Sequence, residues 1–226
     1  MLRAIVFDFD GVLVDSELLH FQAFNNIFRP LHVEMSIQQY YDKFLGLTDE
    51  ELLRLLDKQN NLRLSEQRLQ KLLKEKAAEF KELALTQATV IAGVPEFLKM
   101  LADNKIPMAV CSGALLPEIE MILKGAGLRH FFDVIVSAEQ VKKGKPDPEG
   151  FLLALKLLNK KTSQPINPQD CIVIEDSHWG LEAARAAGMH PIAVTNSYSA
   201  DQLKPSDRTV ANLNQLTLED LCSLCA

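Results

Sequence analysis

The residues of this chain that could do chemistry are carboxylates, a lysine and a serine that follow short apolar runs. Asp8, Asp10 and Asp15 follow the run AIVF, and Glu175 and Asp176 follow the run CIVI. Ser112 and Gly113 follow a third apolar run, MAVC. Lys145 follows a fourth run, DVIV, after a short loop. So much negative charge in one place requires a cation, and hard oxygen ligands with one lysine suit Mg²⁺ and a phosphate ester.

Each of these residues alone has an ordinary structural explanation. A single aspartate at the end of a strand is usually a turn or cap residue. Ser112 could be a loop hydroxyl, and Lys145 before a proline could be a solvated lysine. Four such accidents at successive strand ends, in this order, are improbable together, so the pattern indicates a functional site.

The elements that must position these residues are buried strands alternating with helices. Residues 3–7 and, after Thr89, further apolar runs separated by helical segments of 10–15 residues predict βαβ units and a parallel sheet; the later strands are expected at 107–112, 133–137, 171–176 and 191–194. The runs are apolar throughout, as expected where helices cover both faces. We therefore predict an α/β, Rossmann-like parallel sheet core, with ligands outside the carboxyl ends of its strands.

A long helical segment interrupts this alternation after the first strand. From Ser16 to Thr86 apolar residues recur at spacings of three and four, and Thr48 and Ser65 stand in capping-like positions. We predict an inserted all-α cap domain at residues 16–87, and a core domain formed by residues 1–15 and 88–226.

Composition excludes several classes of partner. The chain has 226 residues with 24 Lys+Arg and 30 Asp+Glu, a formal charge of −6, which argues against nucleic acid. The apolar runs are far shorter than the ~20 residues of a spanning helix, and the N-terminus does not resemble a signal peptide, so we expect no membrane partner and a cytoplasmic location. No apolar seam is obvious, and we expect a monomer or a weak dimer.

The four cysteines do not suggest a disulfide framework at this length. Cys111 and Cys171 lie in strand-like runs, where a small buried apolar residue is the usual role. Cys222 and Cys225 form a CxxC pair without a second pair or nearby histidines to complete a zinc site.

Four sequence motifs of this chain resemble those of the haloacid dehalogenase superfamily of phosphotransferases. They are DFDGVLVDS, AVCSG, KKGKPDPEGF and VIEDSHWG, in this order along nearly the whole chain. The sequence is most similar to the branch with a small helical cap after the first strand, which holds β-phosphoglucomutase-like enzymes and sugar phosphatases.

The resemblance implies a role for each core residue. Asp8 would be the nucleophile that forms an aspartyl-phosphate, and Asp10 the general acid and base. Ser112 and the backbone N–H of Gly113 would hold the phosphoryl oxygens, while Lys145 offsets negative charge. Gly11 of the first motif would also belong to the substrate-binding residues. Asp10 excludes the dehalogenase reaction, which does without an acid/base at this position.

The resemblance also implies a Mg²⁺ site. Its ligands would be the side chains of Asp8 and Asp176 and the backbone carbonyl oxygen of Asp10. Glu175 would bind directly or through water. The metal would allow a carboxylate to approach an anionic phosphate.

The cap is where this family sets its specificity. His20, Gly46 and Lys76 fall where mutase-like members carry a hinge-side histidine, a cap-loop glycine and a cap lysine, and we expect them to bind substrate. Lys76 could equally belong to a solvated helix face, and His20 could be a packed helix residue.

Two departures from the mutase pattern favour hydrolysis. Asp49 stands where the mutases carry an arginine that grips the distal phosphate, and Ala114 where they often carry a hydroxyl. Because a mutase must retain a bisphosphate, the loss of a cap cation would impair a mutase more than a phosphatase that acts on a monophosphate. We therefore predict a phosphatase acting on small phosphate monoesters, a small phosphorylated metabolite being the partner, with a β-phosphoglucomutase-type mutase as the alternative.

Three other functions are less well supported. A non-catalytic binding protein is disfavoured because every catalytic position is filled. A nucleotide-binding oxidoreductase is disfavoured because His130 stands where the third glycine of GxGxxG would fall. Phosphonate hydrolysis would need a cap lysine that forms a Schiff base, for which Lys76 or a neighbour is the candidate.

Overall fold

The computed structural model describes residues 1–44 and 47–225 of the chain. The fold divides into two compact units. One unit, here called the core, consists of Met1–Asp15 and Thr89–Ala226, and the other, here called the cap, is Ser16–Ala88.

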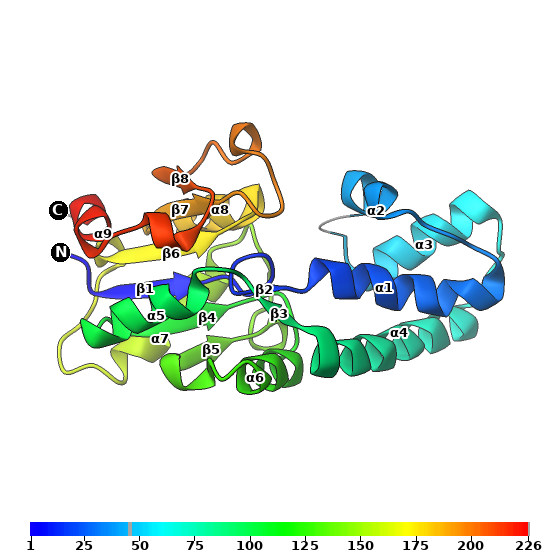
Figure 1. Cartoon of the computed structure of the whole chain (residues 1–226), viewed down its shortest axis with the longest axis horizontal. Helices are drawn as coiled ribbons and strands as arrows, with labels where there is room; N and C mark the ends of the chain where they lie inside the picture. The colour runs from blue at the N-terminus through cyan, green and yellow to red at the C-terminus, as the bar shows by residue number, and fades with distance from the viewer. Residues whose placement is uncertain (45–46, 226) are drawn as a thin grey trace. The chain divides into compact units, whose positions relative to one another are not determined.

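A six-stranded parallel sheet forms the centre of the core (Figure 1). The strands are β1 (Ala4–Phe7), β4 (Met108–Cys111), β5 (Val134–Val136), β6 (Cys171–Glu175), β7 (His190–Val194) and β8 (Arg208–Val210), in the order β5-β4-β1-β6-β7-β8. Neighbouring strands pair in parallel throughout. This architecture confirms the predicted α/β, Rossmann-like fold and places β1 at the middle of the sheet.

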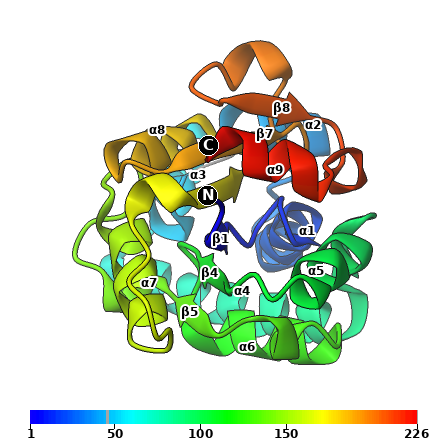
Figure 2. The ribbon, with the colours of Figure 1, turned by 90° about the vertical axis from the view of Figure 1, so that its left-hand side faces the viewer.

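Helices cover both faces of the sheet (Figure 2). The helices α7 (Glu149–Asn159) and α8 (His178–Ala186) pack on one face, in a buried cluster that includes Ala4 and Val6 of β1. On the opposite face the ring of Phe7 meets that of Phe97 in α5 (Val94–Asp103), with centroids 6.1 Å apart. Successive residues of β1 are thus buried on opposite faces, which explains why this strand is apolar throughout.

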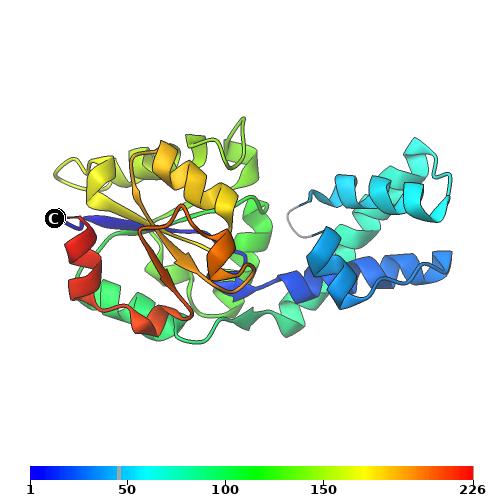
Figure 3. The ribbon, with the colours of Figure 1, turned by 90° about the horizontal axis from the view of Figure 1, so that it is seen from above.

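The remaining core elements lie at the margins of the sheet. The helix α6 (Leu116–Gly125) follows β4, and α9 (Leu218–Leu224) ends the described chain. The Met1 amino group donates to the carbonyl oxygen of Cys225, so the two ends of the described chain lie side by side, as Figures 1 and 2 show. In Figure 3 the red helix α9 accordingly lies near the start of the blue strand β1.

A two-stranded antiparallel ribbon marks the place where the chain leaves and rejoins the core. It pairs β2 (Val14–Asp15) with β3 (Thr89–Val90). The ribbon begins soon after the loop that follows β1, so both connections to the cap start at the carboxyl end of that strand.

The cap consists of helices, as the 3.6-residue periodicity predicts. They are α1 (Glu17–Phe28), α2 (Ile37–Lys43), α3 (Asp49–Asn60) and α4 (Glu66–Gln87). Side chains of Thr48 and Ser65 accept backbone N–H groups at the starts of α3 and α4, which confirms the two predicted caps. The apolar faces of the helices pack on one another around Phe24, Phe28 and Leu53.

Several elements were not predicted. They include the ribbon β2–β3, the edge strand β8 and the helix α9. Short 3₁₀ helices also connect the main elements, at Arg29–Leu31, Arg129–Phe131, Ala138–Gln140, Pro168–Asp170, Ala200–Gln202 and Leu213–Gln215. Within the described residues, no helix combines the length and the apolar character needed to cross a membrane.

Candidate active site

Three buried carboxylates meet at the carboxyl ends of β1 and β6. These strands are neighbours, with Phe7 opposite Ile174, so Asp8 and Glu175 emerge next to each other. Asp8, Glu175 and Asp176 are 7%, 0% and 4% exposed, and an oxygen from each lies within 4.8 Å of the others. Such a concentration of buried negative charge needs a positive partner.

Lys145 supplies part of the positive charge. Its ammonium group donates to a carboxylate oxygen of Asp8 and, at 2.6 Å, to Oε1 of Glu175. The loop that carries Lys145 is fastened to the start of α7, because the carboxylate of Glu149 accepts the backbone N–H groups of Lys142 and Lys143. The sequence places Lys145 far from Asp8, and this loop brings the two together.

The pKa values of the clustered groups are shifted by their burial and by one another's charges. Burial raises the pKa of Asp8 to about 8 although Lys145 opposes the shift. Burial, and then the charge of Glu175, raise the pKa of Asp176 well above its usual value. Burial alone would lower the pKa of Lys145, but Asp8 and Glu175 raise it well above the ordinary lysine value.

Backbone and hydroxyl donors hold Glu175 in place. Its Oε2 accepts the N–H groups of Asp176 and Ser177, each at 3.0 Å, and the Ser177 hydroxyl at 2.9 Å. A Cβ at Gly180, in the first turns of α8, would lie only 1.8 Å from Oε1 of Glu175. The helix can therefore approach the carboxylate this closely only with glycine at that position.

Gly11 allows a similar close approach on the other side of the cluster. Its φ of +75° lies in the left-handed region, and a Cβ there would stand 1.9 Å from Oδ2 of Asp176. The Gly11 N–H donates to the Val14 carbonyl oxygen at 2.8 Å, and Asn196 donates to the Gly11 carbonyl oxygen at 2.7 Å. These bonds fix the turn after Asp10, and a contact of Gly11 with substrate stays a prediction.

Asp10 and Ser112 lie together at the ends of β1 and β4. The Ser112 hydroxyl donates to Oδ2 of Asp10 at 3.3 Å and accepts the N–H of Ala114 at 2.9 Å. A Cβ at Gly113 would meet no atom within 4 Å. The loop after β4 therefore offers open space beside a hydroxyl that contacts Asp10.

The cluster fits a divalent metal ion. It provides hard oxygen donors on three converging side chains, buried and carrying more negative charge than Lys145 balances. The raised pKa values of Asp8 and Asp176 are what carboxylates show when such positive charge is missing. Asp8, Glu175 and Asp176 were all expected near a metal, and the structure brings them together.

Two polar residues of the site were missed in the sequence. Ser197 hydrogen-bonds to the Asp176 carboxyl group, and Asn196 holds the Gly11 loop. Both come after β7, the next strand beyond β6 in the sheet. The other site residues are located by their position directly after a strand, and the same rule applied to β7 would have found these two as well.

The structure brings His20 and Lys76 together within the cap. Lys76 is 2% exposed, and its ammonium nitrogen lies 2.6 Å from Nδ1 of His20 and 2.8 Å from both carboxylate oxygens of Asp49. Burial, and then the charge of Lys76, lower the pKa of His20 well below its usual value, so the ring is neutral. Lys76 is thus no part of a solvated helix face, and Gly46 lies outside the described residues.

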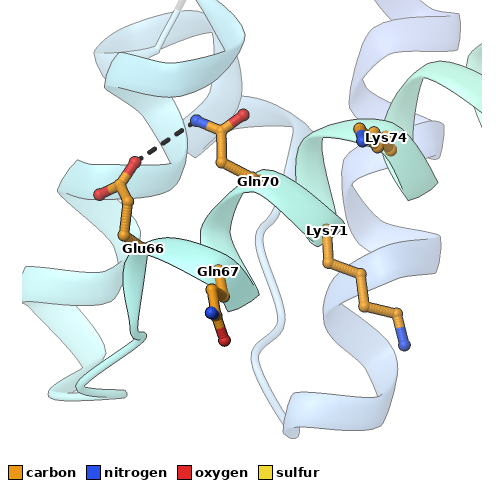
Figure 4. A pocket seen from close by; sticks show the side chains of 5 residues that line it. All are labelled: Glu66, Gln67, Gln70, Lys71 and Lys74. Carbon is orange, nitrogen blue, oxygen red and sulfur yellow. Dashed lines mark hydrogen bonds between the residues drawn. The ribbon is translucent and has the colours of Figure 1, made fainter.

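A hollow on the surface of the cap carries none of these groups (Figure 4). It has a volume of about 420 Å³ and is lined by residues from the first turns of α4, namely Glu66, Gln67, Gln70, Lys71 and Lys74. Glu66 accepts from Gln70 and from Arg54, as on an ordinary solvated helix face.

The chain is similar to several proteins whose names describe phosphoryl-transfer enzymes. A phosphorylated carbohydrates phosphatase from Thermotoga maritima is 32% identical over 192 residues, covering 84% of this chain and 84% of that protein. Hexitol phosphatase A from Escherichia coli is 32% identical over 223 residues, covering 96% and 94%. The structure of a β-phosphoglucomutase from Clostridium difficile covers 100% of this chain and 97% of its own, at 26% identity and a TM-score of 0.81.

A family model agrees with these likenesses. The model described as haloacid dehalogenase-like hydrolase matches residues 5–194, a span that runs from β1 to the end of β7 and includes the whole cap. Together with the carboxylates at the strand ends, this match shows that the chain belongs to the haloacid dehalogenase-like hydrolases, in their β-phosphoglucomutase-like branch.

Proposed function

We propose that this chain is a Mg²⁺-dependent phosphatase that hydrolyses small, sugar-like phosphate monoesters through an aspartyl-phosphate on Asp8. The observation that carries the proposal is the position of Asp8, buried beside Lys145 and two further carboxylates. The names of the Thermotoga maritima and Escherichia coli relatives, a carbohydrate-phosphate phosphatase and a hexitol phosphatase, support this substrate class.

In the first step, a carboxylate oxygen of Asp8 attacks the phosphorus atom, and the bond from phosphorus to the ester oxygen breaks. Asp10 gives its proton to the departing oxygen, so that an alcohol leaves. Lys145 offsets charge on the nucleophile, and the Ser112 hydroxyl with the Gly113 N–H holds the phosphoryl oxygens. Asp8 is then an acyl phosphate, and Asp10 is a carboxylate.

In the second step, Asp10 takes a proton from a water molecule, whose oxygen attacks the same phosphorus atom. The bond to the Asp8 oxygen breaks, which releases inorganic phosphate and restores the Asp8 carboxylate. Dividing the transfer in this way replaces one difficult reaction by two easier ones.

Mg²⁺ would be held by Asp8, the Asp10 carbonyl oxygen and Asp176, with Glu175 beside them. When bound there it would supply the positive charge that allows a carboxylate and a phosphate ester to approach each other.

A β-phosphoglucomutase-type activity is the second candidate, because the Clostridium difficile mutase shares the whole fold. A mutase must hold a bisphosphate at both ends. In this chain the cap lysine is already paired with Asp49, which favours hydrolysis.

Phosphorus NMR separates these two activities. Purified protein is incubated with Mg²⁺, β-glucose 1-phosphate and a trace of glucose 1,6-bisphosphate. We expect inorganic phosphate without isomerisation, from this ester or from a panel of sugar and polyol phosphates. Glucose 6-phosphate appearing without inorganic phosphate would instead establish the mutase.

The covalent intermediate can be trapped directly. Borohydride reduces an aspartyl-phosphate to homoserine, so quenching during turnover should place homoserine in the peptide that contains Asp8. We expect Asp8→Asn and Asp10→Asn to abolish turnover without unfolding the protein, whereas Asp201→Asn, at an exposed site in a surface 3₁₀ helix, should remain active. Either of the first two variants retaining most of the activity would exclude this mechanism.

A further inference from the structure

The ring of Phe151 lies next to the ammonium group of Lys145, inside the core. The Lys145 nitrogen stands over this ring, 5.3 Å from its centroid. A cation within about 6 Å of the centroid, over the face of an aromatic ring, is attracted by the negative charge of that face. Phe151 is therefore a further partner of Lys145, besides the carboxylates of Asp8 and Glu175.

The hydrogen bonds of Lys145 leave room for this contact. An ammonium group has three N–H donors. One donates to a carboxylate oxygen of Asp8, and another donates to Oε1 of Glu175 at 2.6 Å. The remaining N–H group is free to face the ring. Because the Lys145 side chain is only 19% exposed, the ammonium group has lost much of its water, and a cation–ring contact is stronger in such a place than at the surface.

The ring of Phe151 is held firmly in its position. Phe151 lies in the first turn of α7, is 1% exposed and belongs to the buried cluster that includes Ala154 and Val136. A Cβ added at the preceding residue, Gly150, would stand 2.7 Å from Sγ of Cys111 in β4, so this turn packs closely on the sheet. A ring packed in this way cannot swing away from Lys145.

The ammonium group of Lys145 needs such a support. The carboxylate of Glu149 fixes the backbone of the loop at Lys142 and Lys143. A fixed backbone does not by itself place the ammonium group, because a lysine side chain is a flexible four-carbon stem. The ring of Phe151 restricts the end of that stem.

From this arrangement we propose that Phe151 is a positioning residue, whose ring face holds the Lys145 ammonium beside Asp8 during both steps of the reaction. The proposal rests on the proposed phosphatase function. In the first step Asp8 changes from a carboxylate into an acyl phosphate, so the group that Lys145 meets on that side changes. The ring of Phe151 is the same at every stage, and it keeps the ammonium group in place for the second step.

Fluorinated phenylalanines at position 151 test the proposal with little change of shape. Fluorine atoms withdraw charge from the face of the ring, so 4-fluoro-, 3,5-difluoro- and 3,4,5-trifluorophenylalanine weaken its attraction for a cation in steps. We expect kcat at saturating Mg²⁺ to fall in the same order, by about threefold to tenfold for the trifluoro ring. KM should stay unchanged, because Lys145 acts on charge in the transition state.

The same three residues at position 97 are the matched control. Phe97 is also buried in the core, and its ring packs against that of Phe7 with centroids 6.1 Å apart. We expect this series to leave kcat unchanged. Equal losses of kcat in the two series would mean a packing effect and would overturn the role of Phe151.

The contact can also be measured without turnover. Protons over the face of an aromatic ring resonate upfield, so the ε-methylene protons of Lys145 should lie upfield of those of solvated lysines. Their NMR signal is identified by its absence in Lys145→Ala. Phe151→Leu, which removes the ring, should return the signal to the position of a solvated lysine. A Lys145 signal at that position in the wild-type protein would overturn the contact, even if Phe151→Leu failed to fold.

The remaining outcomes separate this proposal from the phosphatase function. If kcat stays within about twofold across the series at position 151, the positioning role is overturned and the phosphatase function stands. If the wild-type protein with Mg²⁺ hydrolyses neither a panel of sugar and polyol phosphates nor p-nitrophenyl phosphate, the phosphatase function is overturned, and the positioning role with it.

Discussion

At the scale of single residues, Lys145 is the side chain on which the electrostatics of the acidic cluster depend most. Its ammonium contacts both Asp8 and Glu175. Replacing Lys145 by alanine would leave buried carboxylates facing one another. In the proposed mechanism it would also remove a positive charge that faces the transferring phosphoryl group.

We predict that Lys145→Ala lowers kcat by about 10²–10³, the usual cost of removing a group that stabilises charge in a transition state. Lys143→Ala is the control, because Lys143 is exposed and pairs with Asp147 at the surface. Initial rates at saturating Mg²⁺ measure the effect, with circular dichroism to confirm the fold. If the kcat of Lys145→Ala lies within a few-fold of the kcat of Lys143→Ala, the assigned role of Lys145 is contradicted.

The residues of the core site could be found from the sequence because of one geometric rule. Parallel strands end at the same edge of a sheet, so Asp8 and Glu175, far apart in the chain, lie together once each is placed at a strand end. No comparable rule predicts which side chains of the helical cap lie together. The sequence shows Asp49 only as a departure from a family pattern, while its ion pair with Lys76 depends on how α3 and α4 pack.

At the scale of elements, the first turns of α8 support the Glu175 carboxylate. The carboxylate is held by Lys145 on one oxygen and by the Asp176–Ser177 backbone on the other. Gly180 lies against it with no room for a side chain. A methyl group there must displace a carboxylate that cannot move without losing these bonds.

We predict that Gly180→Ala raises the Mg²⁺ concentration needed for half-maximal activity by about tenfold, in line with changes to groups that orient metal ligands. Gly125→Ala, at the end of α6, where an added Cβ would meet nothing within 4 Å, should leave that concentration unchanged. Magnesium titrations of initial rate give both values. Equal titration curves for Gly180→Ala and the wild type would show that α8 tolerates the methyl group.

Buried strands stand out in the sequence more clearly than short segments that are partly exposed. The strands β4 and β6 are buried throughout and stand out as apolar runs. In contrast β8 has three residues, of which Val210 alone is buried, and α9 has seven. Such short segments form because they pack against a sheet and a surface that already exist. Their formation depends on tertiary contacts, and these contacts produce no periodic pattern in the sequence.

At the scale of the whole molecule, the charges of the core are what the proposed metal ion would balance. The cluster gathers Asp8, Glu175 and Asp176 in one buried place with one lysine. Removal of the cation would leave like charges facing each other and facing an anionic substrate.

We predict that EDTA abolishes activity and that Mg²⁺ in excess restores it. Mg²⁺ should also raise the temperature of thermal unfolding, because an ion that binds the folded state alone stabilises it. Phosphate release and differential scanning fluorimetry, each with and without EDTA, measure the two effects. Full turnover in EDTA would mean that the carboxylates act without a metal.

The ribbon β2–β3 has a consequence for how this enzyme could evolve. Val14 pairs with Val90 and Asp15 with Thr89, so the points where the chain leaves and rejoins the core are adjacent. A single continuous segment of the chain, Ser16–Ala88, therefore forms the entire cap, with both of its ends at the paired strands β2 and β3. Recombination at that seam would exchange the whole cap, Asp49 and Lys76 together, while leaving the buried carboxylates of the core in place. Since the family resemblance leads us to expect that the cap sets the choice of substrate, one such exchange would change the substrate range in a single step.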